Sequence, residues 1–146
     1  MDDLDRKILS LLAKNARMPV KEIAEQVALT SPAVSSRIHK LETDGIISGY
    51  TVKLNRPADR VYVDALISLS VPPAHRDELV AFMQNSKEVL QCYHVTGAYT
   101  FLIKVSCGSM PQLEHLILHF QELGTTSTQI ILSTPVNHGD LEALML

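Results

Sequence analysis

The segment TSPAVSSRIHK, residues 30–40, gathers side chains that suit contact with a polyanion. It combines hydroxyl groups with cations, and no acid occurs between Ser31 and Leu41. Small hydroxyl residues let a helix backbone approach a groove floor, while Arg and Lys reach phosphates or base edges. The candidate DNA-contacting residues are Thr30, Ser31, Ser35, Ser36, Arg37, His39 and Lys40. The alternative is a solvated helix face with a chance excess of cations.

These side chains share a surface only if the residues between Thr30 and Asp44 form a helix. Thr30 or Ser31 supplies a capping hydroxyl, and Gly45 predicts the helix end because glycine accepts the left-handed conformation. With about 100° of rotation per residue, one apolar stripe faces the core, and the candidate polar side chains lie opposite or beside it. The stripe consists of Val34, Ile38 and Leu41.

Two amphipathic helices are predicted before this segment. The first starts at Asp2 or Asp3, since acids are favourable at a helix N-terminus, and it fades near Asn15. Pro19 opens the second, in which apolar residues recur at helical spacing as far as Val27. So short a connection to the third helix forces a steep crossing, which predicts a helix-turn-helix unit.

Charge is distributed unevenly along the 146 residues. Residues 1–60 carry ten Lys and Arg against eight Asp and Glu, whereas residues 61–146 carry three against eight. This asymmetry predicts two modules with different partners. The small cationic excess of the first module predicts modest affinity for DNA per copy, which assembly of several copies would have to multiply.

The N-terminus carries acids where a signal peptide carries cations, and no apolar run approaches the ~18 residues of a membrane span. We therefore expect a cytoplasmic protein that has no membrane partner. Cys92 and Cys107 are isolated thiols without CxxC spacing. We expect both to be buried rather than part of a disulfide framework.

From Val61 the apolar period changes to two, as in β-strands. The pattern predicts strands over 61–71, 89–96, 99–107 and 127–134, with helices over 76–85 and between Ser109 and Gly124. The order βαββαβ is the ferredoxin-like arrangement. Leu66 and Leu102 fall on the other faces of their strands, so we expect the sheet of a second protomer to cover them.

The predicted fold class is α+β, with a three-helix, winged-helix-like helix-turn-helix domain followed by a ferredoxin-like domain. We place the DNA-binding domain at residues 1–50, a linker strand and hinge at 51–60, the ferredoxin-like domain at 61–136 and a C-terminal tail at 137–146. An RNA-recognition sheet is a poor alternative, because an acidic domain does not suit phosphate.

His115 and His119 stand four residues apart on a predicted helix and could hold a metal ion side by side. No third ligand follows at an obvious spacing, so we expect no metal and assign these residues to a solvated or interface face. Cys92, His94 and Asp64 do not form a nucleophilic triad on sequence spacing alone. We predict no catalytic residues and no cofactor.

A series of short motifs follows in order and without gaps along the N-terminal module. They are Leu4-Asp5, Ile8-Leu9, Glu22-Ile23-Ala24, Leu29-Thr30, Val34, Arg37-Ile38, Leu41-Glu42, Gly45-Ile46-Ile47 and Gly49-Tyr50. In these motifs the chain resembles the Lrp/AsnC (feast/famine) family of prokaryotic transcription regulators, and the resemblance continues to residue 136. It implies a DNA-binding regulator, not an enzyme, whose third helix enters the major groove of double-stranded DNA.

The resemblance further implies that the C-terminal module, of RAM or ACT-like type, senses amino acids and assembles homodimers into a tetramer of dimers. Residues 46–54 would form a linker strand that pairs across the dimer. The implied effector residues are Gly97, Ala98, Tyr99, Thr100 and Thr128. The family loop reads Gly-x-Tyr-Asp, whereas threonine occupies the aspartate position here. We therefore expect either a different effector or a lost response.

Two other functions stay open on the sequence alone. One is a largely non-specific DNA-organising protein of the same family, which the short side chains of the third helix permit. The other is a small-molecule sensor that does not bind DNA and uses its helical head for protein contact.

Overall fold

The computed structural model describes residues 1–137, which divide into two compact units, residues 1–54 with 136–137 and residues 55–135. Within residues 1–137, none of the helices combines the length and apolar character that crossing a membrane requires. The predicted tail at 137–146 lies, from residue 138 on, outside the described residues.

The first unit consists of three helices, α1 (Asp3–Lys14), α2 (Val20–Val27) and α3 (Ser31–Thr43). Local chemistry sets their ends as predicted. Asp2 caps α1, Thr30 caps α3, and Gly45 follows α3 with φ of +72°. The turn between α2 and α3 contains Ala28 in the left-handed conformation, with φ of +54°.

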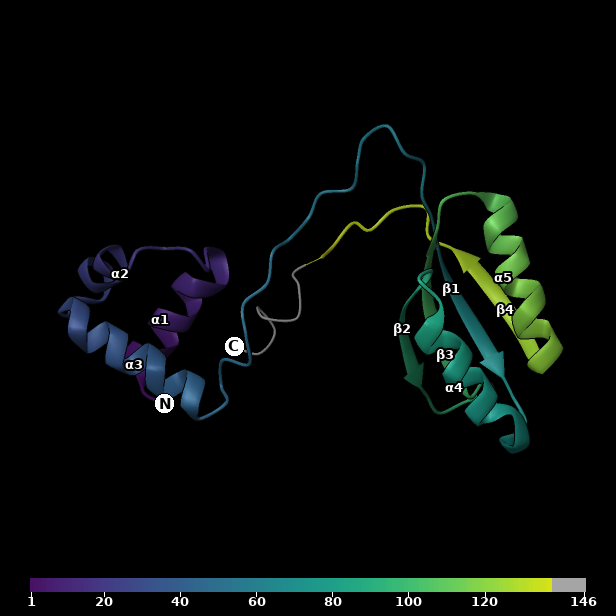
Figure 1. Cartoon of the computed structure of the whole chain (residues 1–146), viewed down its shortest axis with the longest axis horizontal. Helices are drawn as coiled ribbons and strands as arrows, with labels where there is room; N and C mark the ends of the chain where they lie inside the picture. Colours follow the sequence, from purple (N-terminus) through teal and green to yellow (C-terminus); the bar gives the residue numbers. More distant parts are fainter. Residues whose placement is uncertain (138–146) are drawn as a thin grey trace. The chain divides into compact units, whose positions relative to one another are not determined.

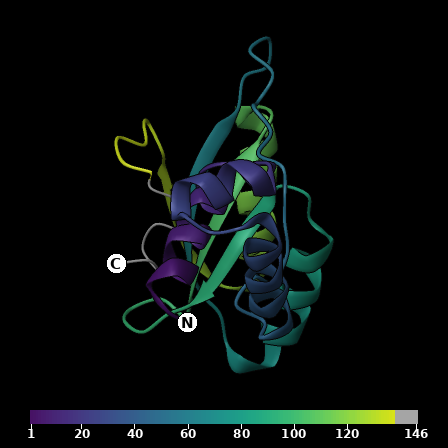
Figure 2. The same cartoon turned by 90° about the vertical axis from the view of Figure 1, so that its left-hand side faces the viewer.

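An apolar cluster joins the three helices. Its buried members are Ile8, Leu12, Ile23, Ala24, Val27 and Val34. Ile38 packs against this cluster from α3, so the predicted stripe does face the core. The two views in Figures 1 and 2 show that α2 and α3 run in different directions, as in a helix-turn-helix unit.

The second unit has the predicted βαββαβ order. Its elements are β1 (Val63–Ser70), α4 (Arg76–Asn85), β2 (Val89–His94), β3 (Phe101–Cys107), α5 (Met110–Leu123) and β4 (Thr125–Ile130), with a short 3-10 turn at Pro73–His75 before α4. The strands form one antiparallel sheet in the order β2-β3-β1-β4. The predicted α+β fold class is confirmed.

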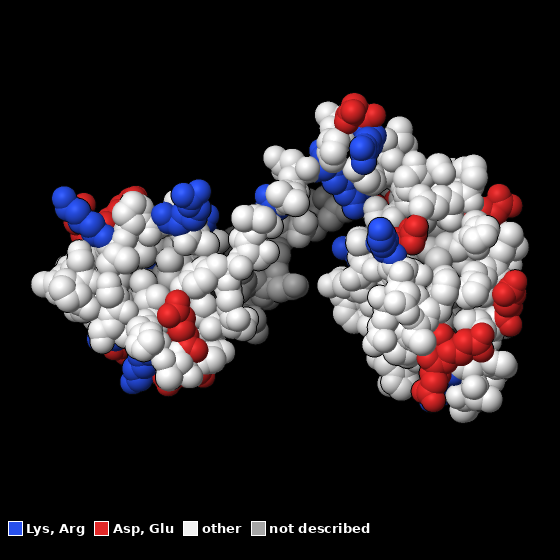
Figure 3. Space-filling model, in the orientation of Figure 1, with Lys and Arg blue, Asp and Glu red and all other residues white. Residues whose placement is uncertain are grey.

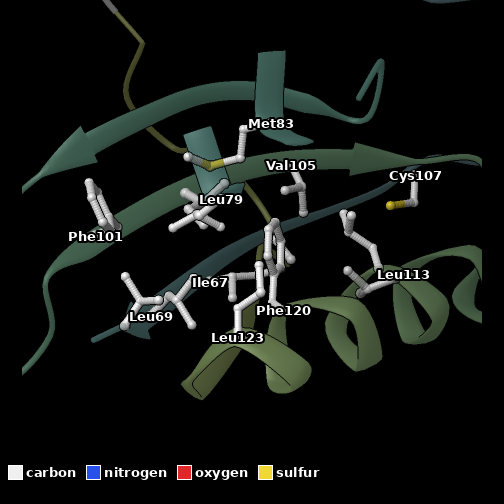
Figure 4. Packing of buried hydrophobic residues seen from close by; sticks show 14 residues of the cluster. Ile67, Leu69, Leu79, Met83, Phe101, Val105, Cys107, Leu113, Phe120 and Leu123 are labelled. Atoms are coloured by element: carbon white, nitrogen blue, oxygen red, sulfur yellow. The ribbon is translucent and has the colours of Figure 1, made fainter. Parts of the chain in front are cut away.

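The core of this unit lies between one face of the sheet and the two helices. Alternate residues of β1 and β3 are buried, beginning with Ala65 and Phe101. Leu79 and Met83 of α4 and Phe120 of α5 close over them (Figure 4). The other sheet face carries Leu66 and Leu102, which are partly buried within a single copy.

The structure corrects two expectations, the bounds of β4 and the burial of Cys92. β4 begins at Thr125 rather than 127 and ends at Ile130, because Ser70 already pairs with Thr125 at the end of β1. Within a single copy the linker, residues 46–54, forms no strand, and its expected pairing partner is the linker of a second copy. Cys107 is buried, but Cys92 is exposed because β2 is an edge strand.

Candidate nucleic-acid interface

Most of the predicted DNA-contacting residues lie on the exposed side of α3. Thr30, Ser35, Ser36, His39 and Lys40 are exposed. Ser31 and Arg37 are half-buried, at the edges of this surface. We call the surface formed by Ser31, Ser35, Ser36, His39 and Lys40 the reading face.

Two polar groups near the reading face have intramolecular partners. The Thr30 hydroxyl accepts a hydrogen bond from the Ala33 N–H at 3.4 Å, which satisfies one amide of the first turn of α3. His39 Nδ1 lies 3.9 Å from Glu42 Oε2, and the His39 side chain is 82% exposed. Glu42 also accepts a hydrogen bond from the Tyr50 hydroxyl at 2.8 Å, which ties the end of α3 to the start of the linker.

Arg37 occupies a different environment from the other candidates. Its Nη1 donates to Asp2 Oδ2 and to Asp5 Oδ1, both at 2.7 Å, and its side chain is only 31% exposed. Both acids belong to the N-terminal end of α1. The guanidinium, which we expected to face DNA, is therefore engaged by two carboxylates of its own chain.

The same two acids form the capping box of α1. Asp2 Oδ1 accepts from the Asp5 N–H at 2.8 Å, and Asp5 Oδ2 accepts from the Asp2 N–H at 2.9 Å. These backbone N–H donors, and after them the Arg37 guanidinium, lower the pKa of both carboxyl groups. The two carboxylates in turn raise the pKa of Arg37.

A shallow depression runs between the start of α1 and the reading face. Met1, Asp2, Asp5, Ala33, Ser36, Arg37 and Lys40 line it. On the side of the helical unit drawn in Figure 3, Lys and Arg form scattered groups with Asp and Glu between them. This mixed surface fits the modest excess of Lys and Arg over Asp and Glu in residues 1–60.

The predicted effector residues fall into two separate places. Gly97, with φ of +115°, lies in the loop between β2 and β3, where glycine is favoured. In the same loop the Thr100 N–H donates to the Leu69 carbonyl at 3.0 Å, so this amide is already committed. Thr128 lies on β4 and pairs with Ile67 of β1. In the sheet, β1 separates β4 from β3. One copy does not bring Thr128 and the loop together.

Of the two histidines His115 and His119 on α5, His119 has a packing role. The His119 ring stacks on Phe82 with centroids 3.9 Å apart, and His119 Nδ1 lies 3.8 Å from Glu122 Oε2. Over residues 1–137, no three His, Cys, Asp or Glu side chains are grouped so that they could hold a metal ion.

The link between Arg37 and the start of α1 was not predicted from the sequence. The spacing of Asp2 and Asp5 does carry a signal, because residues at the cap and three positions later form a capping box. It gives no indication of a partner more than thirty positions away. Only the packing of α3 against α1 brings that partner within reach.

Comparisons with known proteins agree with this architecture. Residues 1–42 match the AsnC-type helix-turn-helix domain, and residues 64–141 match the Lrp/AsnC ligand binding domain. The chain is 30% identical to the transcriptional regulator LrpA of Mycobacterium tuberculosis, covering 92% of this chain and 91% of that protein. It is 30% identical to the regulatory protein AsnC of Escherichia coli, with 93% of each covered.

Solved structures show the same fold. The structure of Escherichia coli AsnC has a TM-score of 0.85 at 29% identity and covers 97% of this chain and 98% of its own. A feast or famine regulatory protein from M. tuberculosis, complexed with L-methionine, has a TM-score of 0.80 at 29% identity, with 94% and 95% covered. The chain therefore belongs to the Lrp/AsnC family and is a helix-turn-helix transcriptional regulator.

Proposed function

We propose that this regulator docks α3 in the major groove of duplex DNA through the reading face. The supporting observation is that Ser35, Ser36, His39 and Lys40 are exposed together on one helix whose opposite side is buried in the head. Short hydroxyl side chains permit close approach, and Lys40 supplies a cation for a phosphate. The regulator acts in the cytoplasm and has no catalytic role of its own.

Salt-dependent binding of the full chain to duplex DNA tests this proposal. Neutralised phosphates make log K fall linearly with log salt, so affinity should drop steeply between about 50 and 200 mM salt. Ser36→Glu adds an acid to the reading face and should abolish binding. Ala13→Glu makes the same charge change at an exposed site on α1 and should bind much better than Ser36→Glu. Absence of binding in dilute salt, or normal binding by Ser36→Glu, would refute the assignment.

A largely non-specific, DNA-organising role is a second candidate. It is favoured by the engagement of Arg37 with two carboxylates, because Arg is the residue best suited to bidentate reading of guanine. Selection from a random duplex pool separates the two functions. Enrichment of one motif supports a sequence-preferring regulator, and an unenriched pool bound with a steep salt slope supports the organising role.

We propose that two copies pair through the linker and the open face of the sheet, and that four such dimers associate. The linker carries Tyr50, Val52 and Leu54 with exposed fractions of 53%, 77% and 82%, an unusual set to leave in water. Leu66, Tyr93 and Leu102 add apolar area on the sheet. Sedimentation equilibrium tests the assembly, and a monomeric mass at micromolar concentration would contradict it.

We also propose that the β2–β3 loop takes part in binding a small effector whose chemistry differs from that of a simple amino acid. The match to the family's ligand binding domain and the L-methionine complex of a relative support an effector. Thr100 stands where the family carries aspartate, so the charge that would meet an α-ammonium is absent from this position. Calorimetry against the common amino acids tests this, and tight binding of any of them would contradict it. Thr100→Asp should gain such binding.

A further inference from the structure

Arg37 is held by a pair of carboxylates whose remaining oxygens are already fixed. Asp2 and Asp5 each use one oxygen to cap α1 and the other to accept from Arg37 Nη1. We call Arg37, Asp2 and Asp5 the capping clamp. It joins the first turn of α1 to the middle of α3 by two charge-assisted hydrogen bonds, which are stronger than hydrogen bonds between neutral groups.

The capping clamp lies beside the reading face and can therefore fix the orientation of that face. Arg37 follows Ser36 directly and lies one turn before Lys40, and all three line the depression beside the start of α1. Val34 and Leu41, about one turn before and after Arg37, anchor α3 in the core. Apolar packing tolerates some rotation of a helix, whereas hydrogen bonds to two fixed oxygens restrict it.

The charges of the clamp argue against a direct DNA contact by Arg37. Two carboxylates face one guanidinium, so the cluster has a net charge of −1. A phosphate approaching Arg37 would meet both acids at close range, because each lies 2.7 Å from Nη1. Lys40 lines the same depression and is exposed on α3.

We propose that Arg37 is a positioning residue, which sets the orientation of α3 on the head through the capping clamp and does not itself contact DNA. This inference rests on the proposed binding of DNA by the reading face. It predicts that Asp5, an acid near the DNA, supports DNA binding, although its charge alone would oppose it.

The experiment measures DNA affinity of the full chain against salt for Arg37→Gln, Arg37→Lys, Asp5→Asn and the double variant Arg37→Gln/Asp5→Asn. Lys40→Gln and Asp3→Asn are the controls. Asparagine keeps an oxygen for the cap of α1, and Asp3 lies in the same turn but pairs with Arg6. All measurements are made well below the unfolding temperature of each variant, so that loss of folded protein does not contribute.

Arg37→Gln should weaken binding about tenfold, because the reading face would be held less precisely against the DNA. The salt slope should stay unchanged, because no phosphate contact is removed. Lys40→Gln should lower the slope by about 0.9, the value for one phosphate. Asp5→Asn should weaken binding, the double variant should be no worse than Arg37→Gln alone, and Arg37→Lys should recover part of the loss. Asp3→Asn should bind at least as well as wild type.

A fall in slope for Arg37→Gln equal to that of Lys40→Gln would overturn the inference, because Arg37 would then contact a phosphate. Loss confined to duplexes that keep one particular base pair would overturn it in favour of base reading by Arg37. Unchanged affinity would show that the clamp matters only for stability. Failure of the proposed function is distinct, since wild type and Lys40→Gln would then show no salt-dependent binding at all.

Discussion

The Nη1 atom of Arg37 lies 2.7 Å from Oδ1 of Asp5, across a sequence separation of 32 positions. With the matching contact to Asp2, it makes part of the stability of the helical unit sensitive to acid. The pKa of both acids is lowered from 3.8, so the folded state binds fewer protons than the unfolded state. Their contribution is complete above this value and is lost as pH falls through the lowered pKa values.

The measurement is thermal unfolding of the full chain at steps from about pH 6 to about pH 3. Wild type should lose stability more steeply than Arg37→Gln, because this variant lacks one of the interactions that lower the two pKa values. The capping hydrogen bonds remain in Arg37→Gln, so some acid sensitivity should persist. Lys40→Gln should follow the wild-type profile. Identical profiles for wild type and Arg37→Gln would show that the ion pairs contribute nothing measurable.

A side chain at Gly124 would clash with the backbone of Ser70. A Cβ atom at this position would lie 2.1 Å from the carbonyl oxygen of Ser70, where β1 and β4 meet at the end of α5. Gly124→Ala should destabilise the second unit by about 2 kcal/mol, within the range for overpacked sites. At Gly108 the nearest atom is the flexible end of Gln112 at 3.3 Å, so Gly108→Ala is the control and should cost far less. Urea unfolding followed by tyrosine fluorescence compares them, and equal costs would contradict the steric account.

Phe120 is the largest fully buried side chain of the chain's described part and projects from α5 toward the sheet (Figure 4). It meets the ring of Phe82 edge-on, with centroids 5.7 Å apart. Phe120→Ala should cost about 3–5 kcal/mol of the free energy of unfolding. Leu118 on the same helix is 54% exposed, and Leu118→Ala should change the stability of an isolated copy by less than about 0.5 kcal/mol. Urea unfolding at low concentration tests the pair, and comparable losses would mean that α5 is packed differently.

Much of the fold could be predicted from the sequence because its signals are local. Caps such as Asp2, Thr30 and Ser109 act within three residues of their partners, so the starts of α1, α3 and α5 follow from short motifs. The alternation of β1 and β3 is equally local. β4 was misplaced because TTSTQI has almost no apolar alternation, and its start depends on the distant contact with Ser70.

The candidate site was predicted less completely, for the same physical reason. A helical wheel orders side chains around α3, and it correctly separates Val34 and Leu41 from the polar side. It says nothing of the acids that α1 brings to Arg37. The sheet order likewise places β1 between β4, which carries Thr128, and the β2–β3 pair, whose loop contains Gly97. The order of strands in the sheet cannot be read from the local sequence pattern.

Leu102 tests the proposed contact between sheets. It lies on the face of β3 away from the helices, opposite Tyr93 on β2 and Ser68 on β1. Leu102→Asp places a charge where a second sheet would cover it, which should shift the protein toward monomers because an unpaired buried charge is costly. Sedimentation equilibrium measures the shift. Val80→Asp makes the same kind of change at a position on α4 that is 39% exposed and should leave the dimer intact. A dimer as tight in Leu102→Asp as in wild type would exclude this face.

The linker gives an independent test of pairing between copies. Residues 50–54 form no strand within the chain, so their amides should exchange with deuterium rapidly in a monomer. In a dimer whose linkers pair, these amides would donate to the partner chain and exchange slowly. Hydrogen exchange read by mass spectrometry should therefore find residues 50–54 protected in concentrated wild type and unprotected after dilution or in Leu102→Asp. The exposed turn at residues 96–98 serves as the internal control and should exchange rapidly in every sample. Rapid exchange of residues 50–54 in a proven dimer would show that the copies associate without the linker strand.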